Sequence, residues 1–181
     1  MQRRLFTSTL LSIPGWVHAQ ADALAERLRA GACVVLLRHA QTDSGIGDPP
    51  GFRLDRCSTQ RNLSAEGRIQ AQSIGQWFTA RSLVPRAVKS SIWCRCQDTA
   101  DLAFGQHQVW PALNSFFDQR GDGDAQTAQL RTVLKRMPAG RFEVWVTHQV
   151  NVTALTGEGI AMGEALILDA AGKVAGRSKF V

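Results

Sequence analysis

Residues 33–42 of this chain read CVVLLRHAQT, and this stretch decides the fold. Its first five residues form a continuous apolar run of strand length, which is typical of a β-strand buried on both faces. Such strands belong to parallel sheets that helices cover on both sides. Because ligands bind beyond the carboxyl ends of the strands in these sheets, we expect Arg38 and His39 to lie at a binding edge.

The rest of the chain alternates predicted strands with predicted helices. A second strongly apolar strand is expected over Phe142 to Thr147, with shorter strands over 87–91 and 108–110. Capping residues and helical periodicity predict helices over 22–30, 64–82, 94–104 and 125–137. Residues 165–169 and 173–175 are typical of a terminal hairpin. These elements predict an α/β fold: a three-layer α/β/α sandwich with a mostly parallel central sheet and a C-terminal hairpin at one edge.

The composition is that of a water-soluble globular domain. The chain has 181 residues, of which 44% are hydrophobic and 20% are charged, and this length suits one hydrophobic core. No run approaches the roughly 18 to 20 apolar residues that a membrane-spanning helix needs. These figures exclude a disordered chain and an integral membrane protein.

The first 21 residues have the pattern of a signal peptide. Arg3 and Arg4 precede a mostly apolar segment, Leu5 to Val17, and small residues offer cleavage sites after Ala19 and Ala21. We therefore expect residues 1–21 to be a signal peptide, residues 22–181 to be a single mature domain, and the protein to be periplasmic or secreted. The alternative is a short buried N-terminal helix. The two arginines also suit a twin-arginine signal, and the export route stays open.

The charge pattern disfavours nucleic acid as a partner. The formal net charge is +6, and cleavage after Ala21 removes two arginines and no acidic residue, which leaves +4. The basic residues are scattered along the chain and form no run, unlike those of a typical nucleic-acid-binding arm. A cluster in space around a small anionic ligand remains compatible with this pattern. The oligomeric state is not readable from the sequence.

Four cysteines remain after processing, and an oxidising compartment permits them to pair. Cys33 opens the first apolar strand and is expected to be a buried free thiol. Cys57 lies in a long polar loop and has Cys94 and Cys96 as possible partners. A zinc site built from Cys94, Cys96 and histidines is the alternative, although C-x-C lacks the usual C-x-x-C spacing.

Chemically active side chains gather where the predicted strands end. Arg38 and His39 follow the first strand, Arg95 follows the strand at 87–91, and His148 follows the strand at 142–147. Arginine holds phosphoryl oxygens with a planar, permanently charged fork. A histidine between two arginines has its pKa lowered, which keeps the imidazole neutral and nucleophilic. This combination indicates phosphoryl transfer.

Four blocks of the chain resemble one known family in the order that the family has them. Residues 37–42, LRHAQT, resemble the R-H-G-x-T signature of the histidine phosphatase (phosphoglycerate mutase-like) superfamily. Residues 62–71, NLSAEGRIQA, are similar to its L-S/T-x-x-G-x-x-Q-A helix start. Residues 90–100, SSIWCRCQDTA, are similar to its S-S-P-x-x-R-x-x-Q-T-A block, and residues 146–148, VTH, to its V-S/T-H-G block.

The resemblance implies a role for each matching residue. His39 would be the nucleophile that carries a transient phosphohistidine, and Arg38 and Arg95 would hold the phosphoryl oxygens. His148 would donate to those oxygens and stabilise the charge in transfer. Thr42 is expected to lie against the phosphate or to orient His39. Neither a metal nor another cofactor is implied, because the cationic pocket replaces it.

Three positions depart from the family pattern. Ala40 and Gln149 stand where glycines are expected, and Ser115 stands where the family has a catalytic glutamate. Serine is a poor proton donor to a leaving alkoxide at neutral pH. Asp118 is the expected substitute general acid, with Asp43 as the alternative.

We therefore expect an exported phosphomonoesterase that hydrolyses a small phosphorylated compound. The alternative is a non-catalytic member of the same fold that binds phosphate or an anionic glycan. The loop from Ala40 to Asn62 is longer than most connections in compact domains, which is typical of a functional loop. Its residue Arg61 is a candidate for substrate binding. The motifs do not identify the substrate, because all family members share phosphate recognition.

Overall fold

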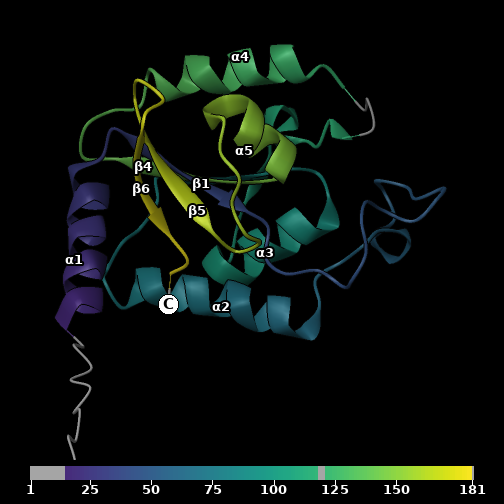
Figure 1. The fold of residues 1–181 in the computed structure, drawn as a ribbon, viewed down its shortest axis with the longest axis horizontal. Helices are drawn as coiled ribbons and strands as arrows, with labels where there is room; N and C mark the ends of the chain where they lie inside the picture. Colours follow the sequence, from purple (N-terminus) through teal and green to yellow (C-terminus); the bar gives the residue numbers. More distant parts are fainter. Residues whose placement is uncertain (1–14, 118–120, 181) are drawn as a thin grey trace, which may run out of the picture.

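Six strands form one sheet in the computed structural model, which describes residues 15–117 and 121–180 (Figure 1). The strands lie in the order β3-β2-β4-β1-β5-β6. Their bounds are β1 Cys33–Arg38, β2 Ala87–Ser90, β3 Gln108–Val109, β4 Phe142–Thr147, β5 Ala165–Asp169 and β6 Val174–Ser178. The first four strands of the order run parallel, whereas β5 is antiparallel to β1 and β6 is antiparallel to β5. The sheet is therefore mixed, and the predicted hairpin occupies one edge.

Helices cover both faces of this sheet. The helices are α1 Gly15–Ala30, α2 Ala65–Thr79, α3 Cys94–Phe104, α4 Gly123–Leu134 and α5 Gln149–Thr156, with short 3-10 turns η1 Cys57–Thr59 and η2 Pro111–Leu113. In Figure 1, α4 and α5 lie above the sheet, and α2 and α3 lie below it. The predicted three-layer α/β/α architecture is confirmed.

Strand β1 shows why two apolar layers form. Because neighbouring strand residues point to opposite faces, Val35 and Leu37 pack into the core between the sheet and helices α1, α2 and α3. Val34 and Leu36 pack into the second core with residues of α4 and α5. All four side chains are fully buried, which explains why the strand has no polar face.

The helix and strand ends differ from the expected ones by a few residues. Helix α1 begins at Gly15 instead of 22, α2 ends at Thr79 instead of 82, α4 spans 123–134 instead of 125–137, and β6 starts at Val174. Helix α5 was not predicted from the sequence. This helix has eight residues, about two turns, and it begins directly after His148, so helical periodicity had few residues to act on.

The expected signal peptide falls on residues 1–21, of which 1–14 lie outside the described residues. Cleavage after Ala21 leaves the part of α1 that carries Ala25 and Leu28, which are buried in the core. Within the described ranges, no helix is both long and apolar enough to cross a membrane.

A small-residue contact positions the loop that follows β1. Gly67 lies in the first turn of α2, where its N–H donates to the capping hydroxyl of Ser64. A Cβ atom at Gly67 would overlap the backbone carbonyl of Gln41, two residues after His39. Glycine is required here because α2 and this backbone touch directly.

We expect Gly67→Ala to lower the free energy of unfolding by about 1–3 kcal/mol, because the added methyl group must displace backbone. Urea unfolding monitored by tryptophan fluorescence measures the change. Gln72→Ala, at an exposed position of the same helix, is the control and should change stability by less than about 0.5 kcal/mol. Equal stability of the two variants would contradict the close contact.

Candidate active site

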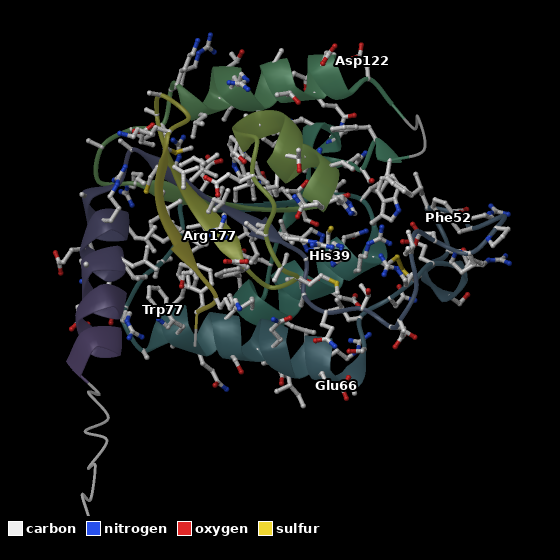
Figure 2. All side chains as sticks on the ribbon, viewed as in Figure 1. His39, Phe52, Glu66, Trp77, Asp122 and Arg177 are labelled. Atoms are coloured by element: carbon white, nitrogen blue, oxygen red, sulfur yellow. A yellow bond between two sulfur atoms is a disulfide. The ribbon has the colours of Figure 1, made fainter. Side chains whose placement is uncertain are left out.

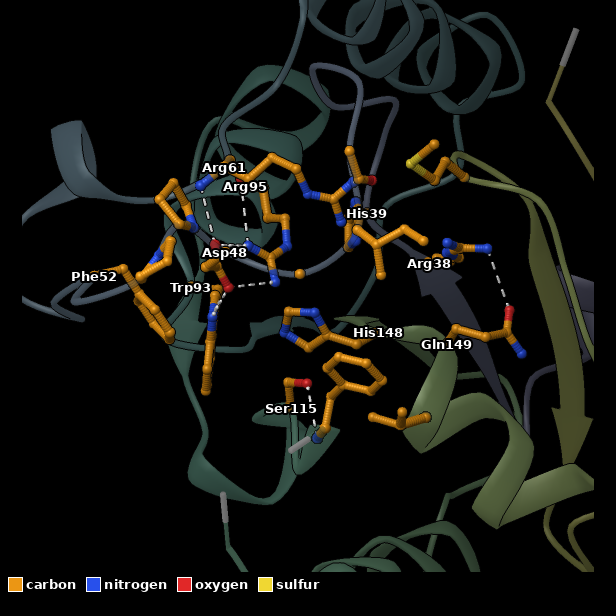
Figure 3. Close-up of a pocket in the computed structure, with 18 of the residues that line it drawn as sticks. Arg38, His39, Asp48, Phe52, Arg61, Trp93, Arg95, Ser115, His148 and Gln149 are labelled. Carbon is orange, nitrogen blue, oxygen red and sulfur yellow. Dashed lines mark hydrogen bonds and ion pairs between the residues drawn. The ribbon is translucent and has the colours of Figure 1, made fainter. Parts of the chain in front are cut away.

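A cavity of about 520 Å³ opens at the carboxyl ends of β1, β2 and β4 (Figure 3). Five of the residues predicted from the sequence line it: Arg38, His39, Arg61, Arg95 and His148. They come from the end of β1, the loop between β1 and α2, the first turn of α3, and the start of α5. Figure 2 shows His39 between the sheet and the projecting loop that carries Phe52.

Two other predicted residues, Thr42 and Asp43, do not line the cavity. Thr42 is buried behind the cavity, where its hydroxyl contacts the sulfur of Met162 at 3.7 Å. Asp43 is exposed and is not among the residues that line the cavity. Asp118 lies outside the described residues. Ser115 does line the cavity, and its hydroxyl accepts a hydrogen bond from the N–H of Phe117.

His39 is held as a neutral imidazole. Its side chain is buried, and Nδ1 lies 2.9 Å from the carbonyl oxygen of Ala40. Since a carbonyl only accepts, Nδ1 carries the proton and Nε2 keeps its lone pair. Burial and the charge of Arg95 lower the pKa of His39 to about 3 despite the carbonyl contact. The ring is therefore in the form that can attack an electrophile.

His148 is assigned the same tautomer as His39, with the proton on Nδ1. Its Nε2 lies 2.8 Å from the hydroxyl of Ser91 and 3.4 Å from the thiol of Cys96. The contact of Ser91 with Asn114 is longer, at 3.3 Å, so we assign the hydroxyl proton to His148 Nε2 and the ring proton to Nδ1. Burial and the charge of Arg95 hold the pKa of His148 well below its ordinary value. The two imidazole rings lie 5.5 Å apart, so one can attack a phosphorus atom while the other donates to its oxygens.

Three arginines line the cavity with unused donors. Arg38 donates to the carbonyl of Ile160 at 2.7 Å and to the side chain of Gln149 at 3.4 Å, and Arg61 donates to the carbonyl of Gly45 at 2.7 Å. The Nε atoms of Arg38, Arg61 and Arg95 are buried without a hydrogen-bond partner in the part of the chain that the structure describes. Unpaired buried donors cost free energy. Because the three arginines also line the cavity, an anion with several oxygens could bind their guanidinium groups there.

Asp48 is the cavity residue that the sequence analysis missed. Its side chain is 6% exposed and pairs with Arg95, with Nη1 to Oδ1 at 2.7 Å and Nη2 to Oδ2 at 3.3 Å. Oδ1 also accepts from the backbone N–H of Arg61, and Oδ2 accepts from the indole of Trp93. Burial raises the pKa of this carboxyl, but the hydrogen bond from Arg95 and the other donors lower it below its usual range. The only sequence signal for Asp48 was its place in the glycine- and proline-rich segment 45–51.

The two glycine replacements have structural explanations. The methyl group of Ala40 packs with Leu63 and Ala71 in a small core cluster and does not enter the cavity. Gln149 is the first residue of α5, and its side-chain oxygen accepts from Arg38 and from the backbone N–H of Ile160. Gln149 therefore helps to hold Arg38 in place.

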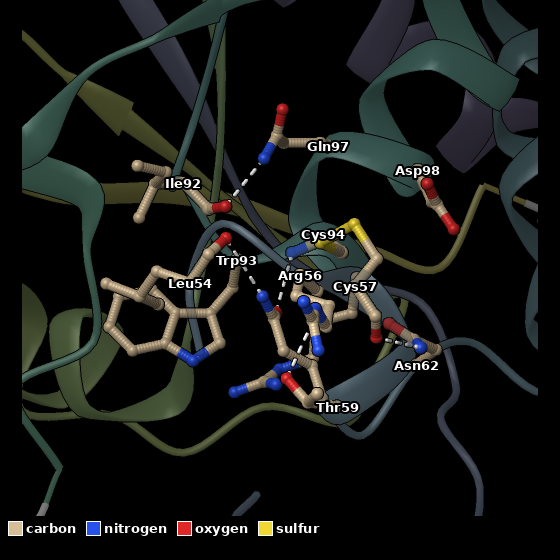
Figure 4. The surroundings of a disulfide bond; sticks show 12 residues. Leu54, Arg56, Cys57, Thr59, Asn62, Ile92, Trp93, Cys94, Gln97 and Asp98 are labelled. Atoms are coloured by element: carbon tan, nitrogen blue, oxygen red, sulfur yellow. Dashed lines mark hydrogen bonds between the residues drawn. A yellow bond between two sulfur atoms is a disulfide. The ribbon is translucent and has the colours of Figure 1, made fainter. Parts of the chain in front are cut away.

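A disulfide joins the long loop to α3 (Figure 4). It links Cys57 to Cys94, one of the two expected pairings, and the alternative pairing with Cys96 is wrong. Cys33 and Cys96 are free and buried, as expected for Cys33. Because Cys94 is in the disulfide, the alternative of a zinc site is also wrong. In the described ranges, no cluster of three or more metal-ligating side chains occurs.

The family model of the histidine phosphatase superfamily, branch 1, matches residues 34–177. The chain belongs to this superfamily. The match spans the strand-end residues at 38–39, 95 and 148 that form the cavity. Among curated proteins, no sequence relative was found.

Solved structures of other proteins share the fold. The protein histidine phosphatase SixA complexed with tungstate is 16% identical, with a TM-score of 0.54, covering 80% of this chain and 95% of that one. The protein TTHB049 from Thermus thermophilus is 21% identical, with a TM-score of 0.56 and coverages of 80% and 98%. The mycobacterial glucosyl-3-phosphoglycerate phosphatase complexed with VO3 is 20% identical, with a TM-score of 0.53 and coverages of 76% and 92%. At these identities the similarity establishes the fold.

We expect the stability of this member of the superfamily to fall as the pH drops below about 6.5. The folded pKa values of His39 and His148 lie below the ordinary value of 6.5, so the unfolded chain binds protons first. Each histidine then removes up to about 1.4 kcal/mol of stability per pH unit. Urea unfolding at pH 7, 6 and 5 measures the slope. His39→Gln should reduce the slope by one proton's contribution, and an unchanged slope would show that His39 is not held neutral.

We expect protein recovered from an oxidising compartment to contain the Cys57–Cys94 disulfide. Peptide mapping without reductant should find these two residues linked and Cys33 and Cys96 as free thiols. Replacing both Cys57 and Cys94 with serine should lower the free energy of unfolding by about 2–4 kcal/mol. Four free thiols, or a bond to Cys96, would contradict the observed pairing.

Proposed function

We propose that this protein is an exported phosphomonoesterase that works through a phosphohistidine on His39. One observation carries the proposal: His39, neutral with Nε2 unprotonated, shares a cavity with His148 and three arginines, Arg38, Arg61 and Arg95. A neutral nucleophile surrounded by cations is suited to an anionic electrophile. Membership of the superfamily and its phosphatase neighbours support phosphatase activity.

The proposed reaction has two steps. His39 Nε2 attacks the phosphorus atom, the bond from phosphorus to the ester oxygen breaks, and the alcohol leaves. Water then attacks the phosphohistidine, and the bond from phosphorus to nitrogen breaks to give inorganic phosphate and free His39. In both steps Arg38, Arg61 and Arg95 hold the phosphoryl oxygens, and His148 donates to them from Nδ1.

The leaving group needs a proton, and the cavity limits its source. Ser115 is a poor donor, and Asp48 is ionised because its oxygens accept from Arg95, Arg61 and Trp93. Asp118 directly follows Phe117, which lines the cavity, and it remains our proposed proton donor. Without such a donor, phosphate esters of acidic alcohols such as phenols would be hydrolysed faster than alkyl phosphates.

The cavity and the cysteines support the rest of the proposal. A volume of about 520 Å³ is that of a site for a small molecule. Phe52, Trp93 and Phe117 line it, so aromatic surface is available to the organic part of the substrate. The signal-peptide pattern at residues 1–21 and the Cys57–Cys94 disulfide support export to the periplasm or beyond, because disulfides persist in oxidising compartments.

We expect His39→Ala to lower kcat/KM for 4-nitrophenyl phosphate by a factor on the order of 10³ or more, because the nucleophile is lost. This ester has a good leaving group and tests the nucleophile without requiring a general acid. His107→Ala, which changes a histidine outside the cavity, is the matched control and should keep the wild-type rate. Rapid acid-free quench of the wild-type enzyme with labelled substrate should trap base-stable phosphate on His39.

Activity of His39→Ala within tenfold of wild type would remove His39 as the nucleophile. No turnover of any phosphate ester by the wild-type protein, with inorganic phosphate still bound, would favour the non-catalytic phosphate-binding alternative. That alternative draws its support from Ser115 at the family's acid position.

A further inference from the structure

Asp48 is a carboxylate in a cavity that otherwise has cationic and neutral side chains at its base. It lies on the loop between β1 and α2, 47 residues before the arginine with which it pairs. A negative charge beside a phosphate site opposes anion binding by simple electrostatics. A buried carboxylate at this place therefore needs an explanation other than charge.

The contacts of Asp48 exclude a role as proton donor. Each carboxylate oxygen accepts two hydrogen bonds: Oδ1 from Arg95 Nη1 and the Arg61 backbone, and Oδ2 from Trp93 and Arg95 Nη2. A protonated oxygen would have to face one of these donors. The group is therefore an ionised acceptor.

The same contacts define the orientation of Arg95. Asp48 holds both terminal nitrogens of the guanidinium, while the buried Nε keeps an unused donor. Pairing through two parallel bonds fixes both the position and the plane of a guanidinium. Figure 3 shows Asp48 between Arg95 and Trp93, on the side of Arg95 away from Gln149.

The loop that carries Asp48 is itself tied to the start of α3. The Cys57–Cys94 disulfide joins the two segments next to Arg95. Gln60 accepts from the N–H of Cys94 and donates to the carbonyls of Arg53 and Leu54. Asp48 therefore belongs to a segment that is anchored to the backbone of the arginine it contacts.

We propose that Asp48 is a positioning residue that orients Arg95 for phosphoryl binding, an inference that rests on the proposed phosphatase function. Orientation strengthens binding, whereas the negative charge weakens it, so the two effects have opposite signs. The sign of the change on removing the charge therefore distinguishes them.

The first experiment measures the dissociation constant of inorganic phosphate by calorimetry for the wild-type protein and Asp48→Asn. We expect the variant to bind phosphate about tenfold more weakly and to show a lower kcat with 4-nitrophenyl phosphate, because Arg95 is no longer held. Equal or tighter phosphate binding by the folded variant would overturn the proposal. Asp55→Asn removes an exposed carboxylate from the same loop and is the control, with unchanged affinity expected.

A double-mutant cycle tests whether Asp48 acts through Arg95. Arg95→Ala should weaken phosphate binding strongly, and adding Asp48→Asn to it should cause no further loss, because there is no guanidinium left to orient. Additive losses would show that Asp48 acts independently of Arg95 and would overturn the proposal. A merely destabilising substitution would lower the thermal midpoint without this coupling.

If Asp48→Asn does not fold, the phosphate affinity of Asp48→Glu is measured instead. The longer carboxylate keeps the charge and displaces the pairing by one methylene group, so the proposal expects weaker phosphate binding than wild type. Wild-type affinity in Asp48→Glu would overturn it. If the wild-type protein binds phosphate and yet Asp48 variants match it, the positioning role fails alone; if the wild-type protein binds no phosphate, the proposed function fails first.

Discussion

The parallel pairing of β1 with β4 is the constraint on which the site depends. The register places Arg38 opposite Thr147, and the ladder continues one step further, with the N–H of His39 donating to the carbonyl of Thr147 at 3.0 Å. His148 directly follows Thr147, the last residue of β4. Two histidines that are more than a hundred positions apart in the chain therefore meet at the same edge of the sheet. Both strands are buried on both faces, so a shift of register would expose apolar side chains and bury polar ones.

Around this pair the fold concentrates positive charge and limits its cost. Buried charges are tolerated when they are paired or hydrogen-bonded. Arg38 is held by the carbonyl of Ile160 and the side chain of Gln149, and Arg95 is held by Asp48. A phosphoryl group that enters the cavity meets guanidinium groups and two imidazoles whose pKa values are lowered. The electrostatic work of assembling the site is done during folding, so little reorganisation is needed at reaction.

The long loop and the disulfide connect the stability of the site to its chemistry. Cys94 is the first residue of α3 and Arg95 is the second, so the bond to Cys57 constrains the backbone that carries a phosphate-binding arginine. The same loop supplies Asp48 and Arg61. The Cys57–Cys94 disulfide, a bond typical of oxidising compartments, therefore constrains the segments that carry Asp48, Arg61 and Arg95.

The sequence alone determined the apolar pattern of β1 and β4, the polar residues that end them, and the four family blocks, because each of these features is local or follows a fixed order along the chain. From them the α/β/α layers and the cavity positions of His39, Arg38, Arg95 and His148 could be predicted, and the length of the loop from Ala40 to Asn62 pointed to Arg61. The tertiary structure decided the pairing of Asp48 with Arg95, the choice of Cys94 over Cys96 as partner of Cys57, and the tautomer of His148. These depend on which side chains meet across separations of 37 residues or more. No local sequence pattern encodes these long-range contacts, because they form only when the loop folds back over the ends of the strands.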